Sequence, residues 1–215
     1  LGLGSGLANP NRRVQAANPN SQVGANQLSH GVPLVALAAI FQHSPSVLLT
    51  RGDDGIETLQ DLRHRRLMLG GGFMNAELTT MLRNAGLPVE KLDLVPSDAV
   101  LESLISGQVD AFSAYTTNEP YFMEKRGLPY KIFQPRDYGV DFYGDVLLTN
   151  EALIAENPKM VAAFREATLK GWAYAVDHPA EIVDLILARY NSQNKTRDPM
   201  TSASVAVGIQ SKIPI

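Results

Sequence analysis

The sequence predicts an α/β fold of two lobes, each built on a mostly parallel sheet flanked by helices. Short apolar strands alternate with helices from Val32 onward, the last third of the chain is mainly helical, and two hinge-like segments interrupt the alternation. Strand and helix alternation is typical of parallel sheets that helices cover on both faces. Two crossings of the chain between lobes would place a ligand in the cleft at the carboxyl ends of the strands.

Short apolar segments bounded by turn residues predict the strands. They cover residues 32–40, 47–50, 66–69, 92–95, 109–113, 131–133 and 146–149. Helices are expected at 74–84 and 98–106, where Gly86 and Gly107 supply the left-handed residue that ends a helix and Ser97 can cap the second helix.

The last third of the chain is expected to form two helices. Asn157 and Pro158 mark the start of the first, and its apolar stripe predicts a helix that faces the core through Val161, Phe164, Thr168, Trp172 and Val176. The pair His178-Pro179 breaks this helix, and residues 180–190 restart one. Trp172 could form a platform for a ligand, but its place on the stripe favours packing.

The expected lobes are discontinuous in sequence. Residues 1–41 and 146–215 form the first lobe, and residues 42–145 form the second. Residues 1–31 show neither helical nor strand periodicity, which indicates either a flexible N-terminus or a segment from which loops are missing. Residues 191–200 have no pattern and are expected to form a mobile loop.

The composition favours a globular protein with a small-molecule partner. Of 215 residues, 45% are hydrophobic, which is enough for a sizeable core. The net charge of −3 and the pI of about 5.8 argue against nucleic acid or an anionic membrane surface as a partner. The absence of cysteine excludes disulfides, thiolate metal sites and a cysteine nucleophile. No apolar stretch reaches the roughly 20 residues of a membrane-spanning helix, and any targeting or anchoring segment is expected outside these residues.

The two hinge-like segments carry the most informative side chains. They are Phe41-Gln42-His43-Ser44-Pro45 and Asp141-Phe142-Tyr143-Gly144-Asp145. Paired aspartates can perform acid-base catalysis, but this spacing does not establish that they converge, and binding is the simpler role. A carboxylate accepts hydrogen bonds from an amino-bearing or cationic ligand, and a tyrosine ring can stack on it. Of the two aspartates, Asp141 is the one expected to fix the loop.

Two further segments lie at the ends of predicted strands. The glycine run 70–72 precedes a helix, so its backbone amides can hold a polar ligand atom, with a plain tight turn as the alternative. Tyr115, Asn118 and Glu119 can bind a ring that bears amino groups, or Thr117 or Asn118 can simply cap the next helix. The residues expected to bind the ligand are therefore Phe41, Gln42, His43, Ser44, Gly71, Gly72, Asn75, Tyr115, Asn118, Glu119, Tyr143 and Asp145.

No catalytic residue, metal site or cofactor is expected. His43 is the histidine in a plausible site, and no nucleophile or second metal ligand stands at a useful spacing from it. It is expected to hydrogen-bond the ligand or the hinge backbone. The basic run 63–66 is expected to be a solvated loop rather than a binding patch.

Three segments resemble one protein family: residues 35–45, residues 101–120 with Gly107-Gln108-Val109-Asp110-Ala111 and Asn118-Glu119-Pro120, and residues 137–145. They are similar to bacterial extracytoplasmic solute-binding proteins of the subgroup related to thiamine-pyrimidine-precursor binding and synthesis proteins, over residues 32–190. The resemblance implies a type II periplasmic-binding-protein fold with two hinge crossings. Such proteins normally open with a strand and an aromatic-containing helix that contribute to the pocket. Residues 1–31 do not show them, so part of the site is expected to be missing here.

The resemblance also implies that the protein is a non-catalytic solute-binding protein, periplasmic or otherwise extracytoplasmic. It would close around a thiamine-precursor-like or other small polar or heteroaromatic solute. Its partners would be that ligand and an ABC permease; the alternative is a periplasmic sensor domain on a membrane-bound histidine kinase or diguanylate cyclase. Fungal relatives synthesise the thiamine pyrimidine with a cysteine-rich motif and an iron-linked histidine, and a chain without cysteine makes that enzyme activity the less favoured alternative. No cofactor and no nucleic acid partner are implied.

Overall fold

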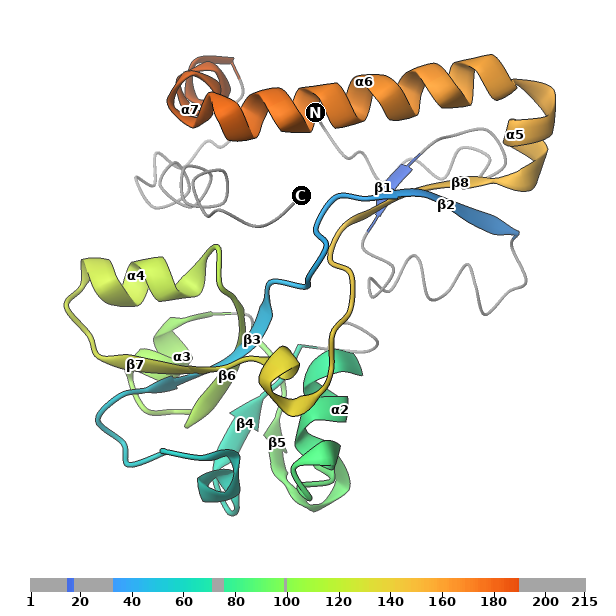
Figure 1. Cartoon of the computed structure of the whole chain (residues 1–215). Helices are drawn as coiled ribbons and strands as arrows, with labels where there is room; N and C mark the ends of the chain where they lie inside the picture. Colours follow the sequence, from blue (N-terminus) through green and yellow to red (C-terminus); the bar gives the residue numbers. More distant parts are fainter. Residues whose placement is uncertain (1–14, 18–32, 71–75, 99, 190–215) are drawn as a thin grey trace. The chain divides into compact units, whose positions relative to one another are not determined.

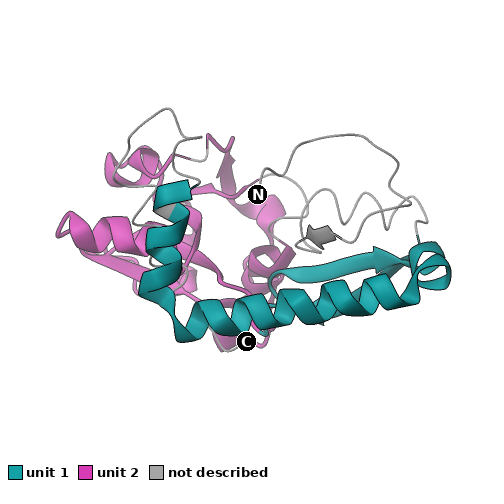
Figure 2. Ribbon diagram, turned by 90° about the horizontal axis from the view of Figure 1, so that it is seen from above, with its two compact units in different colours: residues 1–19, 23–42, 143–215 teal, residues 20–22, 43–142 magenta. Residues whose placement is uncertain are grey.

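The chain divides into two compact units, which Figure 2 shows in different colours. The structure is a computed structural model that describes residues 15–17, 33–70, 76–98 and 100–189. Unit 1 contains the described residues 15–17, 33–42 and 143–189, and unit 2 contains those within 43–142. The chain therefore passes between the units after Gln42 and again after Phe142. The domain boundaries expected from the sequence stay a prediction.

Unit 2 is built on a five-stranded mixed sheet with the order β5-β4-β6-β3-β7. Strand β4 pairs in parallel with β5 and with the central strand β6, whereas β3 pairs antiparallel with β6 and β7. The sequence therefore predicted an α/β unit correctly but overestimated how parallel its sheet is. The strands are β3 (Ser46–Arg51), β4 (Arg66–Met68), β5 (Asp93–Val95), β6 (Ala111–Tyr115) and β7 (Tyr130–Phe133).

Helices cover both faces of this sheet, as Figure 1 shows. Alternate residues of β3 point to opposite faces: Leu48 joins the core under α2 (Ala76–Asn84), and Val47 and Leu49 join the core on the other face. That second core also contains Leu104 and Met123, and α3 (Glu102–Ile105) and α4 (Glu119–Lys125) cover it. Three short 3-10 turns complete the unit: η2 (Leu59–Leu62), η4 (Val89–Lys91) and η5 (Pro135–Tyr138).

Unit 1 contains a three-stranded sheet in which both pairings are antiparallel. Its order is β1 (Gln15–Ala17), β8 (Val146–Asn150) and β2 (Leu34–Ala39). The expected mostly parallel sheet is therefore wrong for the described strands of this unit. Strand β2 leads to one crossing and β8 follows the other, so the chain runs in opposite directions along the two strands. Strand β1 also lies inside the segment 1–31, where the sequence showed no strand pattern.

Helices α5 (Glu151–Glu156), α6 (Pro158–Asp177) and α7 (Pro179–Arg189) follow β8. The predicted break at His178 is confirmed, and Pro158 occupies the first turn of α6 as expected. Asn157 takes the N-cap position of α6 without a side-chain capping bond, whereas Asn150 caps α5 by accepting the Leu153 N–H at 2.8 Å. No helix in the described part of the chain is long and apolar enough to cross a membrane.

The apolar stripe of α6 is less buried than the sequence predicted. Val161 is buried, but the Phe164 side chain is 44% exposed and Val176 is also exposed. The helix has 20 residues and is about 30 Å long. The described strands of the sheet have at most six residues and are at most about 20 Å long, so they cannot cover the whole stripe.

The glycines that were predicted to end helices of unit 2 do so, whereas the predicted N-terminal cap of α3 is not found. Gly86 and Gly107 have φ values of 74° and 75°, which confirms their left-handed role after α2 and α3. The helix expected from residue 98 begins instead at Glu102, and Ser97 does not cap it. The Asp98 carboxylate accepts hydrogen bonds from the Val100 N–H and the Ser103 hydroxyl, and such local bonds compete with helix formation.

Candidate functional site

The two segments that connect the units, called here the first (41–45) and second (141–145) crossing segments, are held to each other within each unit. On the unit 2 side the Ser44 N–H donates to the Phe142 carbonyl at 2.7 Å. On the unit 1 side the Gly144 N–H donates to the Phe41 carbonyl at 2.9 Å, and the Ile40 N–H donates to the Asp145 carbonyl at 2.7 Å. The backbone therefore fixes both ends of the crossing segments.

His43 and Asp141 form a direct side-chain contact within unit 2. The Nδ1 atom of His43 lies 2.8 Å from Asp141 Oδ1 and 3.0 Å from Asp141 Oδ2. This contact agrees with the expectation that Asp141 fixes the loop. It also gives His43 a partner in the second crossing segment rather than in the backbone.

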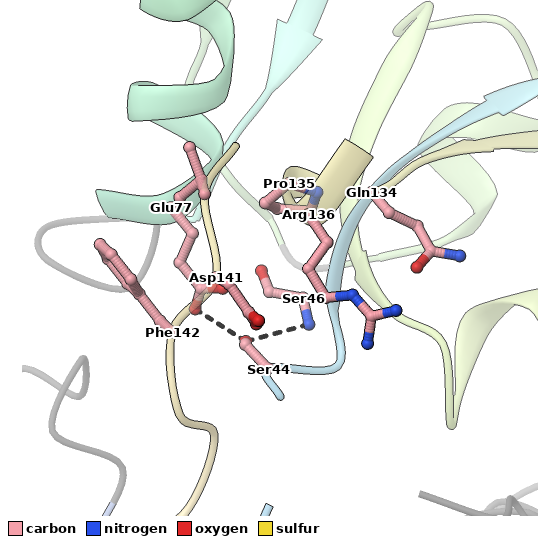
Figure 3. Close-up of a pocket in the computed structure, with 9 residues that line it drawn as sticks. Ser44, Ser46, Glu77, Gln134, Pro135, Arg136, Asp141 and Phe142 are labelled. Carbon is pink, nitrogen blue, oxygen red and sulfur yellow. Dashed lines mark hydrogen bonds between the residues drawn. The ribbon is translucent and has the colours of Figure 1, made fainter. Parts of the chain in front are cut away.

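Ser44 hydrogen-bonds a carboxylate that the sequence analysis missed. Its hydroxyl donates to Glu77 Oε1 at 2.8 Å and accepts the Ser46 N–H at 3.2 Å, and Figure 3 shows both bonds. Glu77 lies in the first turn of α2 and is only 2% exposed. A buried carboxylate needs hydrogen-bond donors, and a helix N-terminus favours its negative charge. A signal was available, because Glu77 lies one turn before the buried Met81 on the apolar face of α2.

A small pocket of unit 2 opens beside these contacts (Figure 3). It encloses about 230 Å³, including its opening to solvent. The space inside it that the centre of a water-sized sphere can reach is only about 10 Å³, which is room for about one water molecule, so the pocket by itself is too small to be a complete solute site. It is lined by Ser44, Ser46, Glu77, Gln134, Pro135, Arg136, Val140, Asp141 and Phe142.

Tyr115, Asn118 and Glu119 form one locally bonded turn at the end of β6. Glu119 Oε2 accepts the Tyr115 N–H at 2.8 Å, and Glu119 Oε1 accepts an Asn118 side-chain N–H at 2.7 Å. Asn118 takes the N-cap position of α4 without a side-chain capping bond. The Thr116 N–H donates to the Pro45 carbonyl at 2.9 Å, which joins this turn to the first crossing segment. The structure thus brings together the turn and the crossing segment that the sequence singled out separately.

Some of the residues of unit 1 that were expected to bind the ligand have contacts within the protein, and others are exposed. The Phe41 ring meets Trp172 edge-on with centroids 5.8 Å apart, so Trp172 packs against the first crossing segment. Gln42 donates to the Ala39 carbonyl at 2.9 Å. The Tyr143 side chain is 58% exposed.

Asp145 is half-buried, and burial raises the pKa of its carboxyl. Among the described residues no ion pair or hydrogen bond reaches this carboxylate. Desolvation without a compensating donor penalises the charged form. Asp145 is therefore a carboxylate that a donor from outside the chain would stabilise.

The remaining candidates are settled only in part. Gly71, Gly72 and Asn75 lie outside the described residues; the adjacent Gly70 N–H donates to the Ser113 hydroxyl at 3.0 Å. Within the described chain, no group of three or more His, Cys, Asp or Glu side chains is placed to hold a metal ion. The assignment of ligand-binding residues as a whole stays a prediction.

The basic run 63–66 is anchored rather than freely solvated. Arg66 Nε donates to Asp110 Oδ2 at 3.2 Å, and Arg65 donates to the Asp54 carbonyl at 3.2 Å. Burial of Asp110 opposes its charge, yet the hydrogen bonds from Arg66 prevail and lower the pKa of Asp110. These arginines connect the start of β4 to the turn before β6, so their role is structural.

Comparison with known sequences identifies a family and two relatives. The family described as NMT1/THI5 like matches residues 15–182. The chain is 29% identical over 170 residues to the formylaminopyrimidine-binding protein of Halalkalibacterium halodurans, covering 77% of this chain and 52% of that protein. It is 24% identical over 164 residues to the riboflavin-binding protein RibY of Chloroflexus aurantiacus, covering 73% and 45%. The chain thus spans about half the length of these relatives.

Solved structures show the same fold. The periplasmic aliphatic sulphonate binding protein SsuA from Escherichia coli superposes with a TM-score of 0.69 at 14% identity, covering 91% of this chain and 61% of that one. The desulfurization enzyme DSZB superposes with a TM-score of 0.60 at 15% identity, covering 96% and 74%. At these identities the likeness shows the two-lobed α/β fold alone, since binding proteins and an enzyme share it.

Proposed function

The chain belongs to the NMT1/THI5-like family, and from this premise we propose that it is the extracytoplasmic solute-binding component of an ABC importer. The solute is a small polar or heteroaromatic compound, and the partner that receives it is the membrane permease. The names of the two relatives support this role, because both are solute-binding proteins.

The observation that carries the proposal is that some side chains of the crossing segments have partners in the protein and others remain available to a solute. His43, Ser44 and Asp141 are engaged in contacts within unit 2, whereas in unit 1 Asp145 presents a carboxylate that no donor of the described residues reaches, and Tyr143 presents an exposed ring. A carboxylate and an aromatic face are suited to a ring that bears amino or N–H groups. The nitrogen heterocycles named for the two relatives have this chemistry.

A non-catalytic role fits the hydrogen bonds of the crossing segments. In nucleophilic catalysis a hydroxyl donates to an adjacent base that a third group orients. Here the Ser44 hydroxyl donates to the buried Glu77, and His43 is bonded to Asp141 instead of to Ser44. We therefore assign Ser44 and His43 to binding and positioning.

Calorimetry with a panel of solutes tests the proposal. The panel contains 4-aminopyrimidine, riboflavin, an alkanesulfonate and an amino acid, and mass spectrometry under native conditions identifies any solute retained from the expression host. We expect one nitrogen heterocycle to bind with a stoichiometry of one and to leave unchanged. Turnover of a bound compound, or the absence of binding across the panel together with an empty protein from the host, would contradict it.

A further inference from the structure

The His43 and Asp141 contact lies at a rigid point of unit 2. The next residue of each segment, Ser44 and Phe142, forms a backbone hydrogen bond of 2.7 Å. Both Asp141 oxygens face the same ring nitrogen, Nδ1, at 2.8 and 3.0 Å. The imidazole orientation is therefore fixed by a carboxylate whose own backbone is fixed.

This geometry determines where the ring proton lies. An ionised carboxylate can only accept hydrogen bonds, so the nitrogen that faces it must carry a hydrogen. In a neutral imidazole the other nitrogen then carries none, and Nε2 of His43 is an acceptor. The ring is 37% exposed, and no hydrogen bond from the described residues reaches Nε2. Nε2 is thus an accessible acceptor.

The charged neighbours do not change this assignment. Glu77 and Arg136 line the pocket beside Asp141; Glu77 is itself a carboxylate, and among the ion pairs of the described residues none joins Arg136 to Asp141. The Ser44 hydroxyl, which is the nearest donor along the chain, donates to Glu77 and not to the imidazole. Asp141 is therefore the group that selects the tautomer.

We propose that Asp141 is a positioning residue that holds His43 in the Nδ1–H tautomer, so that Nε2 accepts a hydrogen bond from an N–H group of the solute. The inference rests on the proposed function for the existence of a solute, and it narrows the solute class. A primary amine, amide or ring N–H matches the acceptor, whereas a sulfonate or carbonyl oxygen would face a lone pair. Doubly protonated His43 would reverse this preference, because Nε2 would then donate.

The tautomer can be measured without any solute. Long-range proton–nitrogen spectra of the uniformly ¹⁵N-labelled chain distinguish the two tautomers, and His43→Gln assigns the signals among the four histidines. We expect the Nδ1–H tautomer to dominate for His43 at a pH where the same spectra show a neutral ring. Asp141→Asn should increase the Nε2–H fraction severalfold, and Asp141→Ala should do the same if the Asn variant misfolds. A dominant Nε2–H form in the wild type, or spectra that neither substitution alters, would overturn the proposal.

Solute selectivity provides the second readout. Calorimetry compares 4-aminopyrimidine with 4-dimethylaminopyrimidine, which has no N–H to donate, at the pH chosen above. The wild type should favour the amino compound about tenfold, as expected for one hydrogen bond, and Asp141→Asn should bring the ratio close to one. If the spectra show that Asp141→Asn changes the tautomer and the ratio of the two affinities stays about tenfold, the inference is overturned. If neither probe binds while the tautomer is as expected, the predicted selectivity for the amino compound fails and the positioning of His43 by Asp141 stands, whereas the proposed function is decided by the full panel and by the search for a retained solute.

Discussion

The two sides of the crossing segments are built differently. On the unit 2 side, side chains hold the segments in addition to the backbone bond from Ser44 to Phe142: His43 contacts Asp141, and the Ser44 hydroxyl donates to the buried Glu77. On the unit 1 side the backbone holds them, through the bonds from Gly144 to Phe41 and from Ile40 to Asp145. Where the backbone provides the attachment, side chains remain available.

This difference separates positioning residues from binding residues. A hydroxyl that already donates to a carboxylate has no hydrogen left for a solute, so Ser44 acts on the site by fixing it. Within the described part of the chain, no hydrogen bond or ion pair engages the Tyr143 hydroxyl or the Asp145 carboxylate. The sequence assigned all of these residues to the ligand alike, because neighbouring positions in a chain do not show which side chains have partners.

The largest effect is expected at Glu77, because it fixes the unit 2 side. Glu77→Ala removes a buried side chain and the acceptor of the Ser44 hydroxyl, and should lower the free energy of unfolding by about 3 kcal/mol. Glu77→Gln keeps the volume and one carbonyl acceptor, so its cost should be about 1 kcal/mol. Urea denaturation measures both. The matched control is Glu102→Ala at an exposed glutamate, for which we expect a change within about 0.5 kcal/mol. If Glu77→Ala lowers the free energy of unfolding no more than this control does, Glu77 does not fix the unit 2 side of the crossing segments.

Asp145 should behave in the opposite way. Asp145→Asn is expected to weaken solute binding about ten- to a hundredfold, the range for a hydrogen bond to a charged group. It should not reduce stability, because burial already penalises the charged carboxylate in the free protein. Calorimetry and urea denaturation of the same variant decide the point. A loss of stability with unchanged affinity would place Asp145 among the positioning residues.

Tyr143 should show a smaller effect of the same kind. Tyr143→Ala removes an exposed ring and is expected to lower affinity about fivefold, as for one stacking contact, with stability changed by less than about 0.5 kcal/mol. Phe164→Ala removes another exposed ring of unit 1, on α6, and serves as the control with unaltered affinity. Equal affinities of the Tyr143 variant and the wild type would remove Tyr143 from the site.

The smallest effects concern pH, and the prediction is the direction in which the contribution of each carboxylate to the free energy of unfolding changes with pH. The raised pKa of Asp145 means that its contribution to stability is full below the pKa of the unfolded chain and is lost as pH rises through the folded pKa. The lowered pKa of Asp110 gives a contribution that is full above the unfolded pKa and is lost as pH falls. Urea denaturation of Asp145→Asn and Asp110→Asn from about pH 3 to 7 should give stability differences from the wild type with opposite slopes. Slopes of the same sign would contradict the assigned environments.

Local signals in the sequence predicted most elements of the fold. Apolar segments located the strands β2 to β8 within one or two residues, and glycine located the ends of α2 and α3. The pairing direction in unit 1 could not be predicted this way, because it depends on where β2 and β8 meet. Strand β1 has three residues and no pattern of its own, and its pairing with β8 defines it.

The candidate site was predicted at the level of segments and less well at the level of side chains. Composition singled out the second crossing segment, which combines two aromatic rings, two aspartates and a glycine beside an apolar strand, and the first was identified as its counterpart because it follows another apolar strand. Glu77 was missed because a glutamate in a helix is normally solvated, although its place one turn before Met81 on the apolar face of α2 indicated that it is buried. The contact of His43 with Asp141 spans 98 positions of the chain, and no local pattern encodes it.

The irregularity in β2 has a consequence for how this chain can change over evolution. Ala36 pairs with Leu148 and Ala38 with Leu147, so Leu37 is an extra residue, and its carbonyl accepts a hydrogen bond from Arg165 Nε at 2.8 Å. A bulge leaves the extra residue unpaired, so that the pairing on both sides of it is kept. Without Leu37 the same pairs would follow one another without interruption, so the half that begins at Leu34 and the half that leads into Phe41 would both keep their facing. The strand can therefore gain or lose length at this point and still deliver the first crossing segment in the same orientation.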